Sequence, residues 1–235
     1  SLEGGDVLFA AKKFNEAEIL FPQSIWAPKS ALMAAYSYYS QDYYGDAIAE
    51  LERYIRVYPL DKNLDYAYYL LGTSYYEQIV SEKKDLQSIS KAKENFTIVV
   101  NKFPNTEYSL DAKFKIDLIN EILASKEMYI GRYYFEKKKW IASINRFRNV
   151  VDNYDETIYA EEALHRLVEV YYVLGLEDES KKYAKLLGYN YQSSEWYKRS
   201  YAMFDTLYKQ KEKNTEKKQK KSVIKKIKSL LDWDE

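Results

Sequence analysis

The sequence predicts an all-α protein: a right-handed α-solenoid of about five tetratricopeptide-like helical hairpins, the first incomplete, with a long helix in the middle. Seven glycines and four prolines make about 5% of the 235 residues, against roughly 12% in an average chain, which excludes collagen-like and turn-rich β architectures. Five segments end on the same aromatic-and-turn pattern. Ahead of each, small or apolar residues recur at helical spacing.

Several residue types that carry chemistry are scarce. The chain has no Cys and one His, which excludes disulfides, thiol nucleophiles, Cys-based zinc sites and metal sites built from two or three imidazoles. It has no glycine-rich phosphate loop and no apolar run approaching ~18 residues. We therefore expect a protein that is not an enzyme and holds no metal and no cofactor. Residues 1–6 carry no signal-peptide pattern, so we expect a processed or trimmed form.

The remaining candidates for chemistry have a simpler interpretation. Glu161 with Glu162, and Asp178 with Glu179, could be imagined as an acid and a base. We expect them instead at exposed helix starts, where negative charge suits the helix dipole. The lone His165 lies between apolar neighbours and is expected to be a packed or surface side chain rather than a ligand.

Five aromatic residues punctuate the chain at intervals of 37, 45, 51 and 37 residues: Phe21, Tyr58, Phe103, Tyr154 and Tyr191. Proline follows the first three, and proline disfavours helical geometry in the residue before it. A Ser, Asp or Thr then follows and can accept hydrogen bonds from the first N–H groups of a new helix. Each unit is therefore predicted to be a helix, a turn and a helix.

The elements follow in order from this punctuation. Residues 6–21 match the second helix of a hairpin, so we expect its first helix to lie outside this chain. The longer intervals indicate insertions, one of about 8 residues around Ser81 to Ser88 and one of about half a repeat after Phe103. Asn105 to Lys139 contains no Pro and one Gly, which predicts one long helix or two nearly continuous ones.

The end of the chain has a different composition. Residues 209–228 carry ten Lys against two Glu, and Ser222 to Trp233 has apolar residues at helical spacing. This tail is predicted to be solvated, or to dock as a short amphipathic helix on another subunit or an anionic membrane. Nucleic acid is disfavoured because the run lacks Arg and interleaved aromatic residues. We divide the chain into a solenoid, residues 1–208, and a tail, residues 209–235.

Ordered motifs over residues 6–205 resemble the BamD family, also called ComL, of tetratricopeptide lipoproteins. They are Tyr36 to Tyr39, Ala47-Ile48, Arg53 to Pro59, Asn63 to Tyr66, Phe103 to Tyr108, Asp111-Ala112, Tyr133 to Glu136, Trp140 and Asn145-Arg146. One departure is Leu71, where the family usually has Arg before a helical Gly.

The resemblance implies a non-enzymatic subunit of the outer-membrane β-barrel assembly (BAM) complex, a periplasmic scaffold for protein insertion into the cell outer membrane. Its partners would be BamA, other assembly-machine subunits and unfolded outer-membrane β-barrel proteins. It would lie at the periplasmic face of the bacterial outer membrane, held by a lipid anchor outside this chain. The alternative is a tetratricopeptide adaptor in another periplasmic pathway, such as cell-division coordination.

Two binding regions are implied by this resemblance. The C-terminal half, about residues 105–208, would bind BamA through Arg146 with Asn145 and Trp140. A guanidinium suits bidentate pairing with a partner carboxylate. The alternative is a structural ion pair of Arg146 with Glu136 or Asp152, or a solvated position.

The N-terminal half, about residues 6–104, would receive the C-terminal targeting segment of unfolded barrels. The candidate groove is aromatic: Trp26, Tyr36, Tyr39, Tyr66 and Tyr69. Tyrosine rings and hydroxyls could meet both the rings and the backbone of an extended peptide. The alternative for each is packing between repeats. Four further tyrosines fall off the apolar stripe and are expected to be more exposed: Tyr38, Tyr43, Tyr68 and Tyr75.

Overall fold

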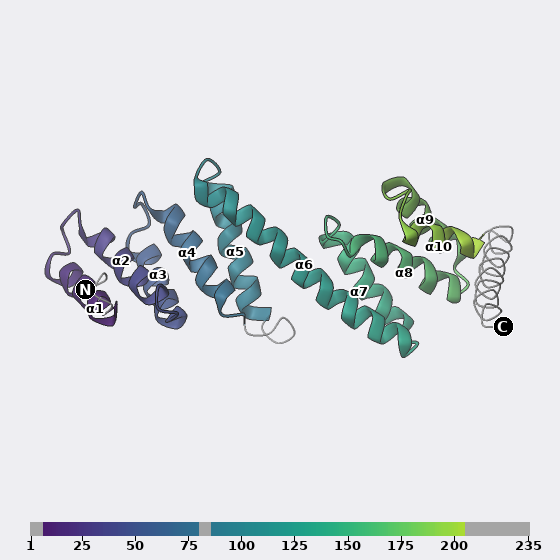
Figure 1. The fold of residues 1–235 in the computed structure, drawn as a ribbon, viewed down its shortest axis with the longest axis horizontal. Helices are drawn as coiled ribbons and strands as arrows, with labels where there is room; N and C mark the ends of the chain where they lie inside the picture. The colour runs from purple at the N-terminus through teal and green to yellow at the C-terminus, as the bar shows by residue number, and fades with distance from the viewer. Residues whose placement is uncertain (1–6, 80–85, 205–235) are drawn as a thin grey trace, which may run out of the picture. The chain divides into compact units, whose positions relative to one another are not determined.

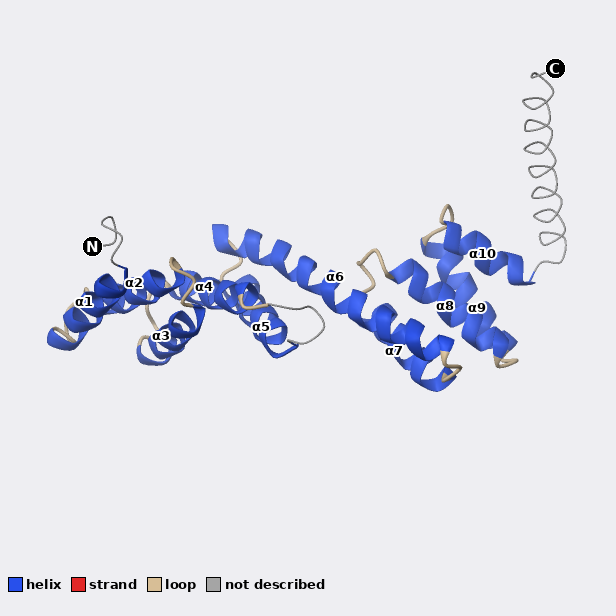
Figure 2. Cartoon of the chain, turned by 60° about the horizontal axis from the view of Figure 1, so that its bottom comes forward, coloured by secondary structure: helices blue, strands red, loops and turns tan. Residues whose placement is uncertain are grey.

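The computed structural model describes residues 7–79 and 86–204, and the regular secondary structure in these ranges is entirely α-helical (Figure 1). The helices are α1 (Val7–Leu20), α2 (Ala27–Tyr39), α3 (Tyr44–Val57), α4 (Leu64–Glu77), α5 (Leu86–Lys102), α6 (Glu107–Glu136), α7 (Trp140–Asn153), α8 (Ala160–Val173), α9 (Glu177–Asn190) and α10 (Glu195–Phe204). The all-α prediction and the helical hairpins are confirmed, and Figure 2 shows helices joined by short loops. Residues 209–235, with the predicted helix from Ser222 to Trp233, lie outside the described residues, as does most of the insertion around Ser81 to Ser88.

The chain divides into two compact units, residues 1–126 and residues 127–235. Within the first unit α1, α2, α3, α4 and α5 pack in sequence, each against the next. Within the second, α7, α8 and α9 pack in the same way, and α10 contacts both α8 and α9. Packing of each helix on its chain neighbours is the nearest-neighbour pattern of repeat proteins. The proposed division into binding halves near residue 104 concerns function and stays a prediction.

The predicted aromatic punctuation falls at the helix ends. The five aromatic residues directly follow the last residues of α1, α3, α5, α7 and α9. Thr106 and Ser194 accept hydrogen bonds from the N–H groups of Ser109 (3.3 Å) and Tyr197 (3.0 Å), as helix caps do.

The capping prediction is wrong for the other three turns. Helices α2, α4 and α8 begin three residues after the polar residue and have no side-chain cap. Ser24 and Asp61 instead accept bonds from N–H groups two residues ahead, Trp26 (3.2 Å) and Asn63 (2.9 Å). Thr157 donates its hydroxyl to the Tyr154 carbonyl (2.7 Å). These polar residues fix the turn and do not cap the helix.

Glycine lets two pairs of helices approach closely. A Cβ at Gly72 of α4 would lie 2.8 Å from the Phe96 ring of α5, and one at Gly131 of α6 would lie 2.5 Å from the Phe147 ring of α7. Both phenylalanine rings are fully buried. A glycine therefore stands where each of these two helix pairs touches, and each phenylalanine fills the space that a side chain would take.

The predicted long central helix is a single helix, α6, of 30 residues. Ala112 and Ile119 of α6 join the core of the first unit with Phe96. Met128 of α6, in the second unit, is fully buried. No helix among the described residues combines the length and the apolar character needed to cross a bilayer.

Candidate functional site

The first unit contains a hollow of about 460 Å³ between α2, α4 and the start of α6. Three tyrosine rings contribute to it: Tyr36, Tyr66 and Tyr108. Lys29, Leu32, Met33, Lys62 and Asn63 complete the lining. Aromatic faces, hydroxyl groups and two ammonium groups therefore converge on one concave surface, which suits a ligand carrying both aromatic rings and carboxylates.

The five aromatic residues predicted for the groove lie at different depths. Tyr36 and Tyr66 line the hollow. Tyr69 packs on Tyr108, with ring centroids 5.2 Å apart, and donates its hydroxyl to Asp111 (2.6 Å). The structure therefore brings Tyr66 and Tyr69 together through Tyr108.

The other two residues of the predicted groove lie outside this lining. Tyr39 packs on Tyr44 of the next helix, with ring centroids 5.8 Å apart. Trp26 is exposed and is connected to the hollow through Lys29, whose ammonium lies 5.4 Å from its ring. Tyr108 is a lining residue that sequence reasoning did not assign to the groove. It lies in the motif Phe103 to Tyr108, so its position just after a turn could have pointed to it.

The hydroxyl groups of Tyr66 and Tyr69 stay neutral. Burial raises the pKa of Tyr66, and burial together with the hydrogen bond to Asp111 raises the pKa of Tyr69. These phenols therefore act as hydrogen-bonding groups and not as charges near neutral pH. Leu71, which stands where the family usually has Arg, is buried in the core formed by α2, α3 and α4.

The expected exposure of four other tyrosines is confirmed for one of them. Tyr43 is exposed, whereas Tyr38, Tyr68 and Tyr75 are half-buried, so the expectation is wrong for these three. Tyr68 packs near the ring of Phe103, and Tyr75 donates its hydroxyl to Glu52 (2.8 Å) on α3. A position off the apolar stripe of one helix is covered here by the neighbouring repeat.

The second unit has a smaller hollow, of about 340 Å³, around Arg146 on α7. Its lining is Glu127, Tyr134, Ala142, Asn145, Arg146 and Asn149. Nη1 of Arg146 donates to both carboxylate oxygens of Glu127, at 3.2 and 3.1 Å. The arginine side chain is 42% exposed and that of Glu127 is 15% exposed, so the arginine remains open to a partner.

The ion pairs that the sequence suggested for Arg146 as an alternative to binding are wrong. Neither Glu136 nor Asp152 pairs with it; Glu127 does, from the preceding helix α6. Asn145 is exposed and lines the same hollow. Trp140 does not line it, because its ring packs edge-on against Phe135, with centroids 5.5 Å apart. The structure therefore brings Arg146 and Asn145 together and leaves Trp140 at the start of α7.

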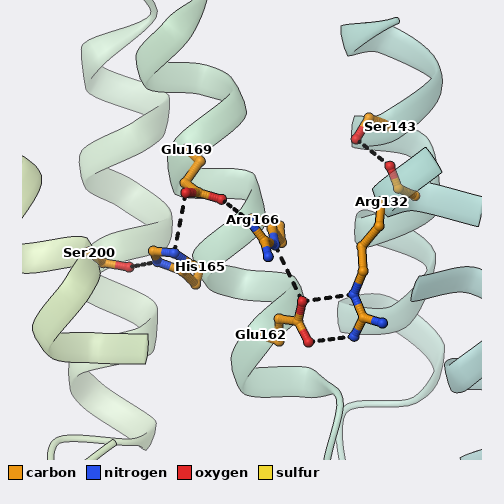
Figure 3. Close-up of polar contacts among 8 residues, drawn as sticks. Arg132, Ser143, Glu162, His165, Arg166, Glu169 and Ser200 are labelled. Carbon is orange, nitrogen blue, oxygen red and sulfur yellow. Dashed lines mark hydrogen bonds and ion pairs between the residues drawn. The ribbon is translucent and has the colours of Figure 1, made fainter. Parts of the chain in front are cut away.

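A chain of ion pairs connects α6, α8 and α10 within the second unit (Figure 3). Arg132 on α6 donates through Nε to Glu162 on α8 (2.9 Å), and Arg166 bridges Glu162 (3.3 Å) to Glu169 (2.7 Å). His165 lies 3.5 Å from Glu169 and 2.8 Å from the Ser200 hydroxyl on α10. This network connects α8 to α6 on one side and to α10 on the other.

The network corrects one prediction and confirms another. Glu161 and Glu162 lie in the first turn of α8, as predicted, but they are not exposed there. Glu161 is half-buried, and the Glu162 side chain is 12% exposed because two arginines hold it. His165 is a packed side chain, as expected, under the Trp196 ring. Burial raises the pKa of Glu169, but the hydrogen bond and charge of His165 and the charge of Arg166 outweigh it and leave that pKa below its ordinary value.

The chain matches the YfiO family, described as outer membrane lipoprotein, over residues 1–187. It is 44% identical over 194 residues to the outer membrane protein assembly factor BamD of Rickettsia prowazekii, which covers 83% of this chain and 77% of that protein. It is 39% identical to BamD of Caulobacter vibrioides, covering 87% and 67%, and 32% identical to BamD of Neisseria meningitidis serogroup A, covering 79% and 73%. The predicted resemblance is confirmed: this chain belongs to the YfiO family of outer membrane lipoproteins.

Proposed function

We propose that this chain is a non-enzymatic scaffold that binds BamA through the Arg146 hollow and unfolded β-barrel proteins through the hollow around Tyr36, Tyr66 and Tyr108. Its relatives are outer membrane protein assembly factors, and the chain is a subunit of that machinery, associated with the outer membrane. The proposal adds the partners and the two surfaces. It also places the protein at the periplasmic face, held by a lipid anchor outside this chain.

One observation carries the proposal for BamA. Arg146 is held in place by Glu127 yet remains open at the surface, next to the amide groups of Asn145 and Asn149. A pre-positioned guanidinium loses little freedom on binding, so it can contribute strongly to an interface with a partner carboxylate. Arginine is among the residues that most often dominate such interfaces.

The test is the charge reversal Arg146→Glu. We expect its affinity for the periplasmic part of BamA to fall at least about tenfold, the equivalent of ~1.4 kcal/mol, in a titration by calorimetry or surface plasmon resonance. Arg56→Glu, at an exposed position in the last turn of α3, is the matched charge control and should bind as wild type. An Arg146→Glu variant that binds BamA with wild-type affinity would refute the assignment.

The proposed substrate hollow is supported by its ligand-facing groups. An extended barrel segment that ends in an aromatic residue presents a ring, backbone amides and a terminal carboxylate. The tyrosine rings can pack on the ring of the segment, the tyrosine hydroxyls can bond its amides, and Lys29 with Lys62 can pair with its carboxylate.

A photo-crosslinking amino acid tests this hollow. Placed at Tyr36, it should capture a synthetic barrel C-terminal peptide. The same group at Tyr43, which is exposed but outside the lining, should not. Equal capture at both positions would show that the peptide binds elsewhere or without a defined site.

A further inference from the structure

Five large apolar side chains project from the turn between α1 and α2. They are Ile19, Leu20, Phe21, Ile25 and Trp26, each between 62% and 87% exposed. Isolated exposed apolar residues are common, but a contiguous group of them marks a contact surface. The corresponding turns show what is ordinary in this fold: the turn from α3 to α4 exposes Val57 and Leu60, and the turn from α7 to α8 exposes Ile158. We name the five residues the α1–α2 tip.

The backbone of the tip is a rigid turn. The N–H of Phe21 donates to the Ala17 carbonyl (3.1 Å), that of Ser24 to the Phe21 carbonyl (3.0 Å) and that of Ala27 to the Ser24 carbonyl (3.0 Å). The N–H of Trp26 donates to the Ser24 hydroxyl (3.2 Å), so four N–H groups of the turn are paired within it. Each group paired in this way lowers the cost of moving the turn into a less polar medium.

The charges around the tip favour an anionic surface. The ammonium of Lys29 lies 5.4 Å from the Trp26 ring centroid. Lys12 on α1 is exposed. Both acidic residues just before the tip on α1 are paired with a base: Glu18 with Arg53 at 2.6 Å and Glu16 with Lys13 at 2.6 Å. A tryptophan beside a lysine at the edge of an apolar group is the arrangement that suits a membrane interface, where rings and aliphatic chains enter the lipid and ammonium groups remain at the headgroups.

We infer that the α1–α2 tip inserts into the surface of an anionic phospholipid bilayer. A fluid lipid surface accommodates exposed apolar side chains without a complementary pocket, and the chain is associated with the outer membrane. None of the five tip residues lines either proposed binding hollow, and Lys29 is the residue that the tip's surroundings share with the substrate hollow. The inferred contact is separate from any lipid anchor, because the side chains of the tip supply the apolar surface.

The test uses this 235-residue chain, unlipidated, with vesicles of phosphatidylethanolamine and phosphatidylglycerol. The lysine-rich residues 209–228 would also attract such vesicles, so the measured signal must come from the tip itself. In a Trp233→Phe background, which removes the tryptophan of the tail, lipids brominated on their acyl chains should quench the fluorescence of Trp26, and Trp26→Phe should remove most of the quenching. Neutral phosphatidylcholine vesicles should quench less, because Lys12 and Lys29 then lack a counter-charge.

A second variant measures how much the apolar side chains of the tip contribute to vesicle binding. Leu20→Ser with Ile25→Ser should lower the vesicle partition coefficient at least tenfold, whereas Leu60→Ser with Ile158→Ser, at turns of the same kind, should leave it unchanged. Wild-type partitioning by the Leu20 and Ile25 variant, or quenching that survives Trp26→Phe, would overturn the inference. So would a wild-type dimer that this variant dissociates in light scattering, because the tip would then be an interface between two copies.

Discussion

Glu18 illustrates how one side chain can join repeats that are far apart in sequence. It lies on α1 with its side chain 8% exposed, and Arg53 on α3 holds it through two bonds of 2.9 and 2.6 Å. The Tyr58 hydroxyl donates a third bond, at 2.7 Å. Burial raises the pKa of Glu18, but the bonds from Arg53 and Tyr58 outweigh it, so the pKa lies below its ordinary value. Burial and this carboxylate raise the pKa of Tyr58 to about 12.

Glu18→Gln should lower the free energy of unfolding at pH 7 by ~1–3 kcal/mol, because a charge-assisted pair becomes a weaker contact beside a partly buried Arg53. The pKa of a glutamate in the unfolded chain is about 4.3. A carboxylate whose pKa is lower in the folded state stabilises the fold fully at a pH above the unfolded-state pKa, and this stabilisation is lost as the pH falls through the folded-state pKa. The difference between wild type and Glu18→Gln should therefore shrink below about pH 4.

Urea unfolding at pH 7 and at pH 3.5 measures both effects of this substitution. Glu16→Gln is the matched control: it lies on the same helix, and its ion pair with Lys13 is a surface contact. We expect no measurable change for Glu16→Gln. A constant difference between wild type and Glu18→Gln at both pH values would contradict the proposed role of its charge.

The helices could be predicted from the sequence, whereas the contacts between side chains of different helices could not. Periodicity and the aromatic turns predicted the helical hairpins and the long central helix, because an amphipathic helix reveals its buried face. It could not identify which residue of a neighbouring helix opposes a given side chain. The Arg146 pair with Glu127, the Glu18 pair with Arg53 and the place of Tyr108 in the hollow all depend on how two helices cross, and that geometry leaves no local signal.

The two glycine contacts give a prediction about helix crossings. Gly131→Ala should lower the free energy of unfolding by ~1–3 kcal/mol, because the new methyl group would meet the buried Phe147 ring at 2.5 Å and force it to shift. Gly45→Ala, in α3, meets nothing within 4 Å and should be neutral or stabilising by up to about 0.5–1 kcal/mol through helix propensity. Thermal unfolding of the two variants measures the contrast, and equal effects would contradict a close crossing at Gly131.

Helix α6 is the continuous element that joins the two compact units of the chain. Helix α6 runs from Glu107 to Glu136, and the boundary between the two compact units falls within it, after Lys126. In repeat proteins, cooperativity passes from one neighbour to the next, so we expect an unbroken helix at the boundary to let each unit stabilise the other. The proposed BamA hollow and the proposed substrate hollow lie wholly in different units, and α6 is the element that contributes to both.

Ser125→Pro tests this coupling. Proline removes the backbone hydrogen bond to the residue four positions earlier and clashes with that carbonyl, at a cost of ~3 kcal/mol or more within a helix. We expect calorimetry to show the wild type unfolding in one transition or two overlapping ones, and the variant in two clearly separated ones. Hydrogen exchange should show new opening around residue 125, while BamA affinity and peptide crosslinking, each confined to one unit, persist. Ser125→Ala controls for loss of the hydroxyl. If Ser125→Pro kept the wild-type unfolding profile, the two units would be stable independently and α6 would connect them without coupling their stability.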